Sequence, residues 1–461
     1  MPETIRRPSQ MVDHDELARL FPPPPEYFTG AWLDEPDEID RKKLARLQRR
    51  AVAAYEIPFH RDRWKAAGVS PQDLVALSDV GDFPTYDVDD IRASIDAHPP
   101  LGNYQGADID DLLANPLRIH SSGGTTGKQR PTLYTAWDRE AGALLMARGL
   151  YLQGVRPGDT VLNSWSYGLH NGAFIFDEAV WGWLNCLVIT TSTGNVTSTR
   201  KQVELARDYG ASAILTTGPY MVRLAEEAAA MGLDLRKDLK LTCLPMNVGS
   251  EEAVEELYGM PVLRSYGFHE VQTISSECPA RKGLHIFEDA FHAQVVDPET
   301  GEELPDGELG SLVITEMYKT GSAQFRYNTL DLAALMPREQ CECGSWQRRM
   351  TPFAGRADNM VKLRGVNVWP EGVGALVADV DGASSEYFVT ARRDGVNESL
   401  TASITVASPE VDPADLKERV ARHLHQAFGI VIEVEVLSRE HLDQLTELAT
   451  SPKPKRFGDL R

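Results

Sequence analysis

A run of hydroxyl-bearing and glycine residues that ends in a lysine could hold phosphate groups. It reads SSGGTTGK and comprises Ser121, Ser122, Gly123, Gly124, Thr125, Thr126, Gly127 and Lys128. Glycines and hydroxyl residues allow backbone N–H groups and side-chain hydroxyls to surround phosphate oxygens, while lysine supplies positive charge. The spacing is not that of the P-loop NTPases, so a flexible surface turn is the alternative to a phosphate-binding loop.

A second group combines three cysteines with one histidine. Cys278 and His285 are separated by six residues, and Cys341 and Cys343 follow as C-x-C-G. Three thiolates and one imidazole suit tetrahedral Zn²⁺, and the glycine allows the tight return that two thiolates on one ion require. The sequence therefore predicts a structural zinc site, with unrelated buried thiols as the alternative. Catalysis by this ion is not expected, because four protein ligands leave no open position.

Strand-like and helical segments alternate after the phosphate-binding run. Apolar stretches such as TVLNSW, NCLVITT and SAILTT are separated by helical patterns at residues 199–209 and 220–231. This alternation is typical of βαβ units and predicts a mostly parallel sheet. Short strands around turn signals between Phe287 and Thr315 indicate a β-rich subdomain. Before all of these, apolar residues at helical spacing between Asp40 and Gly68 predict one amphipathic helix.

The C-terminal part of the sequence has a different pattern. A strand pair around VKLRGVNVWP and a hairpin precede the helical segment DPADLKERVARHLHQAFG. In that helix we expect Asp412 as N-cap, Pro413 at the first position and Gly429 as C-cap. The whole chain is therefore predicted to be an α/β protein. A large N-terminal domain of parallel sheets, helices and a β-rich subdomain would span residues 1–354, and a small α+β domain residues 355–461.

Composition and charge exclude several classes of protein. With 461 residues, of which 42% are hydrophobic and 25% charged, the chain can form more than one folded domain. A formal net charge of -21 and a pI near 5.0 argue against nucleic acid or an anionic membrane as a partner. Five cysteines in so long a chain do not indicate a disulfide scaffold. Apolar runs are short and the N-terminus is polar, so we expect a cytoplasmic protein.

The run SSGGTTGK resembles the nucleotide loop of the adenylate-forming superfamily of acyl-CoA synthetases, adenylation domains and luciferases. Further segments follow in the order of that superfamily: VGSEE, YGFHE, RYNTLD and GRADNMVKLRGVNVWP. Within the superfamily the chain most closely resembles the phenylacetate-CoA ligase family, through IPFHRDR, RIHSSGGTTGK, SYGLHNG, TTGPY, ECPARKGLHIFED and PKPKRFGD. The resemblance covers essentially the whole chain.

The resemblance implies a site for ATP and Mg²⁺. The adenine base would lie against a wall and an aromatic face formed by Gly249, Ser250, Glu251, Tyr266 and Gly267. Glu270, which closes YGFHE, resembles the carboxylate that binds Mg²⁺ between the ATP phosphates. A solvated loop acid is the alternative interpretation of Glu270.

Two residues resemble the family's ribose contacts. Asp331 resembles the acid that accepts both ribose hydroxyls, and Arg356 resembles the ribose-side arginine. Leu330 occupies the position where the family has a glycine. This difference calls the local turn into question, although the acid itself is retained.

Lys453, in the C-terminal SPKPKR, resembles the lysine that bridges the acyl carboxylate and the α-phosphate during adenylation. A cation there would stabilise the charge that develops on those oxygens in the transition state. A solvated tail lysine is the alternative, and Lys455 competes for the same role. The expected catalytic residues are Lys453, Glu270 and Lys128. The family also implies that the small domain rotates between two half-reactions, with Asp358 at the hinge.

The acid substrate is expected between SYGLHNG and the adenine wall. Aromatic faces, a polar group and small residues gather there, namely Tyr167, His170, Asn171, Gly172 and Ala173, with Trp165 nearby. This mixture fits a flat ring better than a long alkyl chain. His170 could equally be a packed loop histidine.

The resemblance therefore implies an ATP-dependent ligase that activates a small aromatic acid as its acyl-AMP and transfers the acyl group to coenzyme A. A carrier-protein thiol or an amine is the alternative acceptor, and a non-catalytic nucleotide sensor is the alternative of another class. Retention of Lys453 beside the nucleotide residues argues against a sensor, which has no need of it. Homodimers are common among similar proteins.

Overall fold

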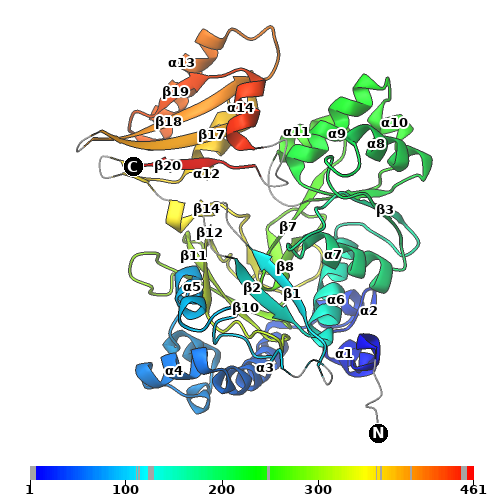
Figure 1. Ribbon diagram of the computed structural model, residues 1–461, viewed down its shortest axis with the longest axis vertical. Helices are drawn as coiled ribbons and strands as arrows, with labels where there is room; N and C mark the ends of the chain where they lie inside the picture. The colour runs from blue at the N-terminus through cyan, green and yellow to red at the C-terminus, as the bar shows by residue number, and fades with distance from the viewer. Residues whose placement is uncertain are drawn as a thin grey trace. The chain divides into compact units, whose positions relative to one another are not determined.

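The protein is built from interspersed helices and strands, as the computed structural model in Figure 1 shows. The structure describes residues 7–110, 112, 115–122, 129–246, 250–359, 361–363, 366–394, 397–447 and 454–461. The chain divides into two compact units, the first comprising Met1–Thr329 and Ala333–Pro352 and the second Leu330–Leu332 and Phe353–Arg461. The mixed α/β architecture confirms the fold class that the sequence predicts.

A short parallel sheet lies in the first unit. β3 (Thr160–Asn163) is the central strand and pairs in parallel with β4 (Leu187–Thr190) and β5 (Ala213–Leu215). Helix α8 (Thr199–Asp208) connects β4 to β5, and α9 (Gly218–Ala230) follows β5. In Figure 1 these helices (green) lie together beside β3. The alternation of strands and helices in the sequence correctly predicts this part, because parallel strands require crossover connections.

The neighbouring five-stranded sheet is mostly antiparallel. Its order is β13-β9-β8-β7-β6, and within it β6 (Leu244–Met246) and β7 (Val262–Phe268) pair in parallel. The antiparallel pairs are β7 with β8 (Gln272–Glu277), β8 with β9 (Leu284–Ile286) and β9 with β13 (Arg349–Met350). Strands β7 to β9 follow one another through short turns, which only antiparallel neighbours permit. The turn between β7 and β8 carries Glu270.

The strands that flank the SSGGTTGK run form a β-hairpin. β1 (Arg118–Ser122) and β2 (Arg130–Tyr134) pair in antiparallel register, with Ser122 opposite Arg130. Helix α6 (Ala136–Leu152) begins only after β2, where Thr135 accepts a hydrogen bond from Asp138 N. The run therefore does not open directly into a helix, which separates it structurally from a P-loop.

The predicted single helix between Asp40 and Gly68 is two helices, α3 (Pro36–Glu56) and α4 (Pro58–Ala67). The prediction of one helix is wrong because Pro58 has no N–H and cannot continue a helix, although it suits the first position of a new one. The remaining helices of the first unit include α1 (His14–Leu20), α2 (Glu26–Thr29), α5 (Val88–Ala97), α7 (Gly172–Asp177), α10 (Leu235–Asp238) and α11 (Glu251–Tyr258).

The β-rich region predicted after Phe287 is also present. β10 (Phe291–Val296), β11 (Gly310–Glu316) and β12 (Tyr327–Ala333) are consecutive neighbours in a four-stranded sheet, and β14 (Gly355–Arg356) is its last strand. β10 and β11 are antiparallel, as are β12 and β14. β12 is the strand at which the chain first passes into the second unit.

The second unit is a small α+β structure. Its sheet has the order β19-β18-β17-β20, built from β17 (Ala383–Asp394), β18 (Asn397–Val406), β19 (Glu433–Val436) and β20 (Phe457–Leu460). β17 and β18 form the predicted antiparallel hairpin, and both outer strands pair in parallel. A short pair, β15 (Val361–Leu363) and β16 (Val366–Val368), precedes this sheet.

Helix α13 (Pro413–Phe428) of the second unit has the predicted end signals. Asp412 accepts a hydrogen bond from Ala414 N at 3.0 Å, and Gly429 ends the helix with φ 68°. Apolar residues of α12 (Pro370–Ala378) and α13 form one core cluster with the sheet, and α14 (Arg439–Thr446) follows β19. Among the residues that the structure describes, no helix is long and apolar enough to cross a membrane.

Burial of His60 in α4 makes folding stability pH-dependent. His60 is 1% exposed, and burial lowers its pKa from 6.5 to about 4. At a pH between these two pKa values, His60 is protonated in the unfolded chain and neutral in the folded chain, so the free energy of unfolding falls as the pH falls. Between pH 7 and pH 5 we expect this group to remove about 2 kcal/mol from the free energy of unfolding.

Urea unfolding at several pH values measures this loss. The His60→Gln variant, which keeps a donor for Ala323 O, should show a flatter pH dependence than the wild type. Replacement of the exposed His98 by Gln serves as the control and should keep the wild-type slope. An unchanged slope in His60→Gln would contradict the assignment.

Candidate active site

Three segments that are far apart in the sequence meet at the β1–β2 hairpin. Ser121 N donates to Leu169 O at 2.9 Å, which ties β1 to the SYGLHNG loop. The ring centroid of His170 in that loop lies 5.6 Å from that of His269, in the turn between β7 and β8. Tyr134, at the end of β2, donates its hydroxyl to His269 O. The strands flanking the predicted nucleotide loop, the predicted acid pocket and the turn with Glu270 therefore share one region of the first unit.

Part of the predicted nucleotide loop can be placed. Ser121 is buried, and its Oγ has no hydrogen-bond partner within the part of the chain that the structure describes. Ser122 is the last residue of β1. The rest of the run lies outside the described residues, namely Gly123, Gly124, Thr125, Thr126, Gly127 and Lys128.

Glu270 is a buried carboxylate, 5% exposed, in the turn between β7 and β8. Its Oε1 lies 3.9 Å from Arg130 Nη2, which is longer than a hydrogen bond. A carboxylate supplies the hard oxygen atoms that Mg²⁺ prefers, so the side chain fits the metal that the family implies. The solvated loop acid considered above does not describe a side chain this deeply buried.

The predicted adenine wall lies at the start of α11 and along β7. Ser250 precedes α11 in a left-handed conformation with φ 59°, Glu251 is the first helical residue, and Gly249 lies outside the described residues. Tyr266 is a buried residue of β7, 7% exposed. Gly267 follows it at a register shift of the β7–β8 pair.

The two predicted ribose residues lie opposite each other within the second unit. Asp331 in β12 and Arg356 in β14 are register partners, and Arg356 Nη1 donates to Asp331 Oδ1 at 3.0 Å. The same guanidinium donates through Nε and Nη2 to both carboxylate oxygens of Asp358, each at 2.8 Å. Arg356 therefore connects the expected ribose acid with the expected hinge residue.

Leu330, at the position where the resemblance implies a glycine, lies within β12 in a backbone conformation that favours glycine. Its φ is 61°, in the left-handed region that β-carbon-bearing residues adopt at a cost of roughly 1–2 kcal/mol. Asp331 nevertheless keeps its pairing with Arg356. The substitution has therefore changed the conformational energy of this strand while leaving the acid in register.

The SYGLHNG loop contains both stacked rings and buried polar contacts. His170 stacks on Trp165 with a centroid distance of 6.4 Å and an interplanar angle of 9°, and its Nδ1 accepts a hydrogen bond from Gly172 N at 2.9 Å. Asn171 accepts a hydrogen bond from Arg139 of α6. Arg139 also pairs with Glu178 at 2.5 Å. These contacts fix the loop on α6.

Two further residues of the predicted pocket anchor the loop to β3. Tyr167 donates its hydroxyl to Asp177 Oδ2 at 2.6 Å, and burial together with this carboxylate raises the pKa of the tyrosine above its usual value. Ala173 is fully buried, and its carbonyl accepts from Asn163 Nδ2 at 2.9 Å. Because the tyrosine hydroxyl is occupied, the ring of Tyr167 is the part available to a ligand.

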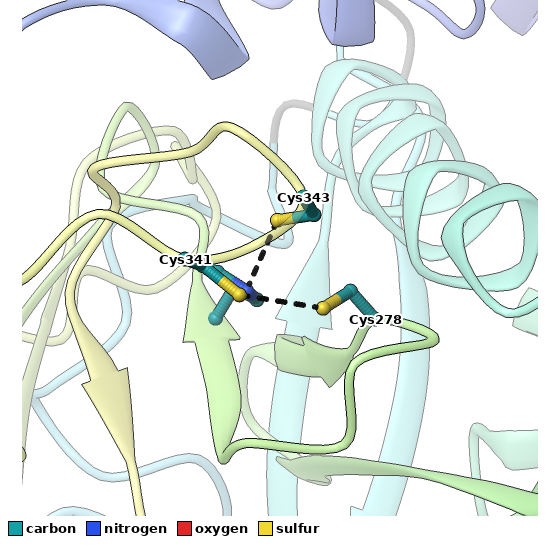
Figure 2. A group of neighbouring side chains, drawn as sticks. Cys278, Cys341 and Cys343 are labelled. Carbon is teal, nitrogen blue, oxygen red and sulfur yellow. Dashed lines mark hydrogen bonds between the residues drawn. The ribbon is translucent and has the colours of Figure 1, made fainter.

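The four predicted zinc ligands come together in the first unit. Cys278 follows β8, His285 lies in β9, and Cys341 and Cys343 lie in the loop before β13. Their donor atoms all lie within 4.8 Å of one another. The sulfurs of Cys278 and Cys341 are 3.7 Å apart, and Cys343 Sγ is 3.5 Å from His285 Nε2. Figure 2 shows the three cysteine side chains turned toward a common point.

This spacing fits a tetrahedral metal site. Ligands about 2.3 Å from a zinc ion would lie about 3.8 Å from each other at the corners of a tetrahedron. Gly344 adopts φ 87° and donates its N–H to Cys341 O at 2.8 Å, which makes the tight return between the two loop cysteines. The contact with Cys343 and burial raise the pKa of Cys278 to about 12, whereas the contact with Cys278 lowers the pKa of Cys343.

Of the two C-terminal lysines, Lys455 lies among the described residues. Lys453 lies outside the described residues. Lys455 forms an ion pair with Glu447, and its backbone N–H donates to Thr446 O at 2.7 Å.

Some residues that hold this site carry no recognisable motif and are not among the predicted site residues. Arg139 is one, and Lys319, whose ammonium lies against the turn with Glu270, is another. A signal for Arg139 exists, because charged residues interrupt the otherwise apolar AWDREAGALLMARGLYL of α6, and Asp138, Arg139 and Arg148 are all buried there. Lys319 lies in the segment after β11, directly behind Met317 and Tyr318, and the sequence around it offers no such signal.

Comparison with known proteins first defines a class. Residues 365–461 match the family model described as the AMP-binding enzyme C-terminal domain. The crystal structure of a 2-hydroxyisobutyryl-CoA ligase in the postadenylation state has a TM-score of 0.82 and 23% identity, and the match covers 93% of this chain and 91% of that one. The fold is therefore that of the AMP-binding, adenylate-forming enzymes.

Two phenylacetate-coenzyme A ligases identify the family. The one from Aromatoleum evansii is 32% identical over 438 residues, covering 92% of this chain and 95% of its own. The one from Thermus thermophilus is 33% identical over 437 residues, covering 87% and 94%. The chain belongs to the phenylacetate-coenzyme A ligase family, which confirms the resemblance seen in the sequence.

Gly267 provides a test of the geometry around Glu270. A β-carbon at this position would lie 1.8 Å from Gln272 O, so the register shift between β7 and β8 cannot accept a side chain. We expect Gly267→Ala to lower the free energy of unfolding by more than about 2 kcal/mol, measured by urea denaturation. Gly182→Ala is the matched control, because a β-carbon there meets nothing within 4 Å. Equal stability of the two variants would contradict this geometry.

Proposed function

We propose that the protein is an AMP-forming ligase that joins a small aromatic carboxylic acid to coenzyme A. The observation that carries the proposal is the meeting of the β1–β2 hairpin, the SYGLHNG loop and the turn with Glu270, in a chain that belongs to the phenylacetate-coenzyme A ligase family. Glu270, Asp331 and Arg356 are the described residues that would hold Mg·ATP in this reaction. A cytoplasmic location and a homodimer stay predictions.

In the first half-reaction, an oxygen of the acid attacks the α-phosphorus of ATP, and pyrophosphate leaves with the bond electrons. The bound Mg²⁺ would offset the negative charge of the phosphates, and Glu270 is the residue that would hold it. Asp331 would accept hydrogen bonds from the ribose hydroxyls while Arg356 fixes its orientation at 3.0 Å. Lys453 would stabilise the charge that develops on the acyl and phosphate oxygens.

In the second half-reaction, the thiol attacks the acyl carbonyl, loses its proton, and AMP leaves. No covalent bond to the enzyme is needed, so catalysis rests on positioning and on charge stabilisation. The second unit carries Lys453 and the expected hinge Asp358, whose bond to Arg356 ties the hinge to the ribose contact. Rotation at this hinge would withdraw Lys453 after adenylation.

The aromatic specificity is argued from the SYGLHNG loop. The ring of His170, which stacks on the buried Trp165, and the ring of Tyr167, whose hydroxyl is occupied by Asp177, are half-buried and would offer flat faces to the acid. Such faces suit a planar ring. A carrier-protein thiol or an amine stays the alternative acceptor, because no segment of the sequence defines the coenzyme A contacts.

The cysteine and histidine cluster is proposed as a structural zinc site. Three thiols and one imidazole with mutual distances within 4.8 Å fit a tetrahedral ion, and all four positions would be taken by protein. The ion would join the end of β8 to the loop before β13. It would not take part in catalysis.

Pyrophosphate release is the direct test of the activity. Purified protein with Mg·ATP should release pyrophosphate with at least one acid among benzoic, phenylacetic, hydroxybenzoic and aminobenzoic acids, and form an acyl-CoA when coenzyme A is added. Short aliphatic acids serve as the comparison. Acid-dependent release without acyl-CoA would point to another acceptor, and no release across the panel would favour the sensor.

The two C-terminal lysines provide the matched variants for that assay. Lys453→Ala should abolish adenylation and spare thioester formation from preformed acyl-AMP, because the lysine acts on charge that develops only in the first step. Lys455→Ala removes the ion pair with Glu447 and should keep both half-reactions. Equal loss of both half-reactions in Lys453→Ala would exclude the assigned role. If Lys455→Ala lost adenylation while Lys453→Ala kept it, Lys455 would be the catalytic lysine.

Metal analysis tests the zinc site independently of activity. The purified protein should contain a single zinc ion per chain, and removal by a chelator should lower the thermal midpoint of unfolding, because metal binding to a folded site adds to stability. Cys341→Ser should lose the ion, while Cys186→Ser, a buried cysteine outside the cluster, should retain it. A metal-free protein of full stability would refute the site.

A further inference from the structure

We infer that Lys319 is a positioning residue for adenylation, which together with two tyrosines fixes the backbone of the turn that carries Glu270. The inference rests on the proposed function, because it requires Glu270 to act on Mg·ATP. Lys319 lies in the turn after β11 and matches none of the predicted site residues. Its ammonium donates to the backbone carbonyl of Glu270 and not to the carboxylate.

Three consecutive carbonyl oxygens of the β7–β8 turn each accept a hydrogen bond from a buried side chain. The pairs are Tyr134 Oη with His269 O, Lys319 Nζ with Glu270 O at 2.6 Å, and Tyr318 Oη with Val271 O at 2.7 Å. A turn between two antiparallel strands normally leaves such carbonyls to solvent. Here the three donors restrict the backbone on both sides of Glu270.

The turn needs such support because its backbone is strained. Gln272, the residue that follows Val271, adopts φ 69°, which is a left-handed conformation for a residue with a side chain. Conformations of this kind cost roughly 1–3 kcal/mol and persist only where the surroundings enforce them. Gly267 on the other side of the turn is held by the close approach of Gln272 O. The position of Glu270 therefore depends on contacts outside the two strands.

Burial of Lys319 carries a large desolvation cost. The side chain is 0% exposed, and burial lowers its pKa to about 8. Its ammonium lies 4.2 Å from the ring centroid of Tyr134 and donates to Ser322 Oγ at 2.8 Å. An apolar residue would fill a purely structural position without this desolvation cost. The lysine is better explained by what its charge holds, which is the carbonyl of Glu270.

Two buried carboxylates keep Lys319 in place. Glu316 accepts hydrogen bonds from the backbone N–H groups of Tyr318 at 2.9 Å and Lys319 at 2.8 Å. Asp138, at the start of α6, accepts from Thr320 N at 2.6 Å and Gly321 N at 2.8 Å. The segment around Lys319 is thus bonded at both ends, and the lysine has a rigid base from which to hold Glu270.

The first test compares Lys319→Met with the wild type. Methionine keeps the length and apolar contacts of the side chain and removes the donor. We expect the rate of pyrophosphate release at saturating acid to fall by about 100-fold, because a misplacement of about 1 Å has this effect on catalysis. The Mg²⁺ concentration needed for half-maximal rate should rise, and thioester formation from preformed acyl-AMP should stay near the wild-type rate.

Hydrogen exchange of the free protein provides a readout without catalysis. In Lys319→Met, amides of residues 268–273 should exchange faster, while those of β18 in the second unit should not change. Lys201→Met, which replaces an exposed lysine of α8, is the matched control and should keep both the exchange pattern and the rate. A folded Lys319→Met protein with wild-type exchange and wild-type Mg²⁺ dependence would overturn the inference.

A second variant and the wild-type activity separate the possible outcomes. Tyr318→Phe removes one hydroxyl and its hydrogen bond to Val271 O, and it serves as the test if Lys319→Met does not fold. This variant should show the same changes in exchange and rate at smaller amplitude. Wild-type exchange and wild-type rates in Tyr318→Phe would overturn the inference. If the wild type itself released no pyrophosphate with any acid, the proposed function would be at fault. The exchange comparison would then still decide whether Lys319 holds the turn.

Discussion

Buried ion pairs connect the N-terminal helices of the first unit to its sheets. Lys43 and Arg50 of α3 reach Glu288 at 2.6 Å and Glu316 at 3.1 Å, and Arg148 of α6 reaches Asp289 at 2.9 Å. Removal of one partner from such a pair costs about 3–5 kcal/mol, because the other charge is left buried alone. These pairs therefore fix how the helices pack on the strands, and the positions of the site residues depend on that packing.

Glu316 shows how this constraint reaches the site. The carboxylate that pairs with Arg50 also accepts the backbone N–H groups of Tyr318 and Lys319, and these two side chains hold the turn with Glu270. A chain of contacts thus runs from the N-terminal helix α3 to the carboxylate expected to hold Mg²⁺. Each step uses a backbone group or a buried charge, so none of it depends on a flexible surface side chain.

Local chemistry explains what the sequence could predict. The caps of α13, the return at Gly344 and the strand–helix alternation around β3 each depend on residues close in sequence, and all three are present in the structure. The four residues of the cysteine and histidine cluster could be grouped because few other interactions explain their residue types. The short turns around β7 make its sheet mostly antiparallel, although the alternation of strands and helices predicts parallel strands. The helical spacing between Asp40 and Gly68 likewise continues past Pro58, although α3 ends before this residue.

Other features could not be derived from residue types. Lys319 and Tyr134 act through contacts with residues more than thirty positions away, and nothing in their immediate neighbours marks them. Arg139 stands out only as a charge within an apolar helix, and its partner Asn171 is also more than thirty positions away in the sequence. Leu330 adopts φ 61° within β12 although leucine disfavours this conformation, and Asp331 is paired with Arg356, because the pairing of β12 with β14 outweighs the preference of one residue.

The burial of Lys319 also has a chemical consequence. An amine whose pKa has fallen to about 8 is uncharged more often than a surface lysine and is therefore the better nucleophile. An enzyme that forms acyl-AMP generates an acylating agent in its own interior. Lys319 is fully buried, with the ring of Tyr134 on one side and hydrogen bonds to Glu270 O and Ser322 Oγ. The same packing that fixes Glu270 would thus also keep the amine of Lys319 away from an acyl-AMP formed in the site.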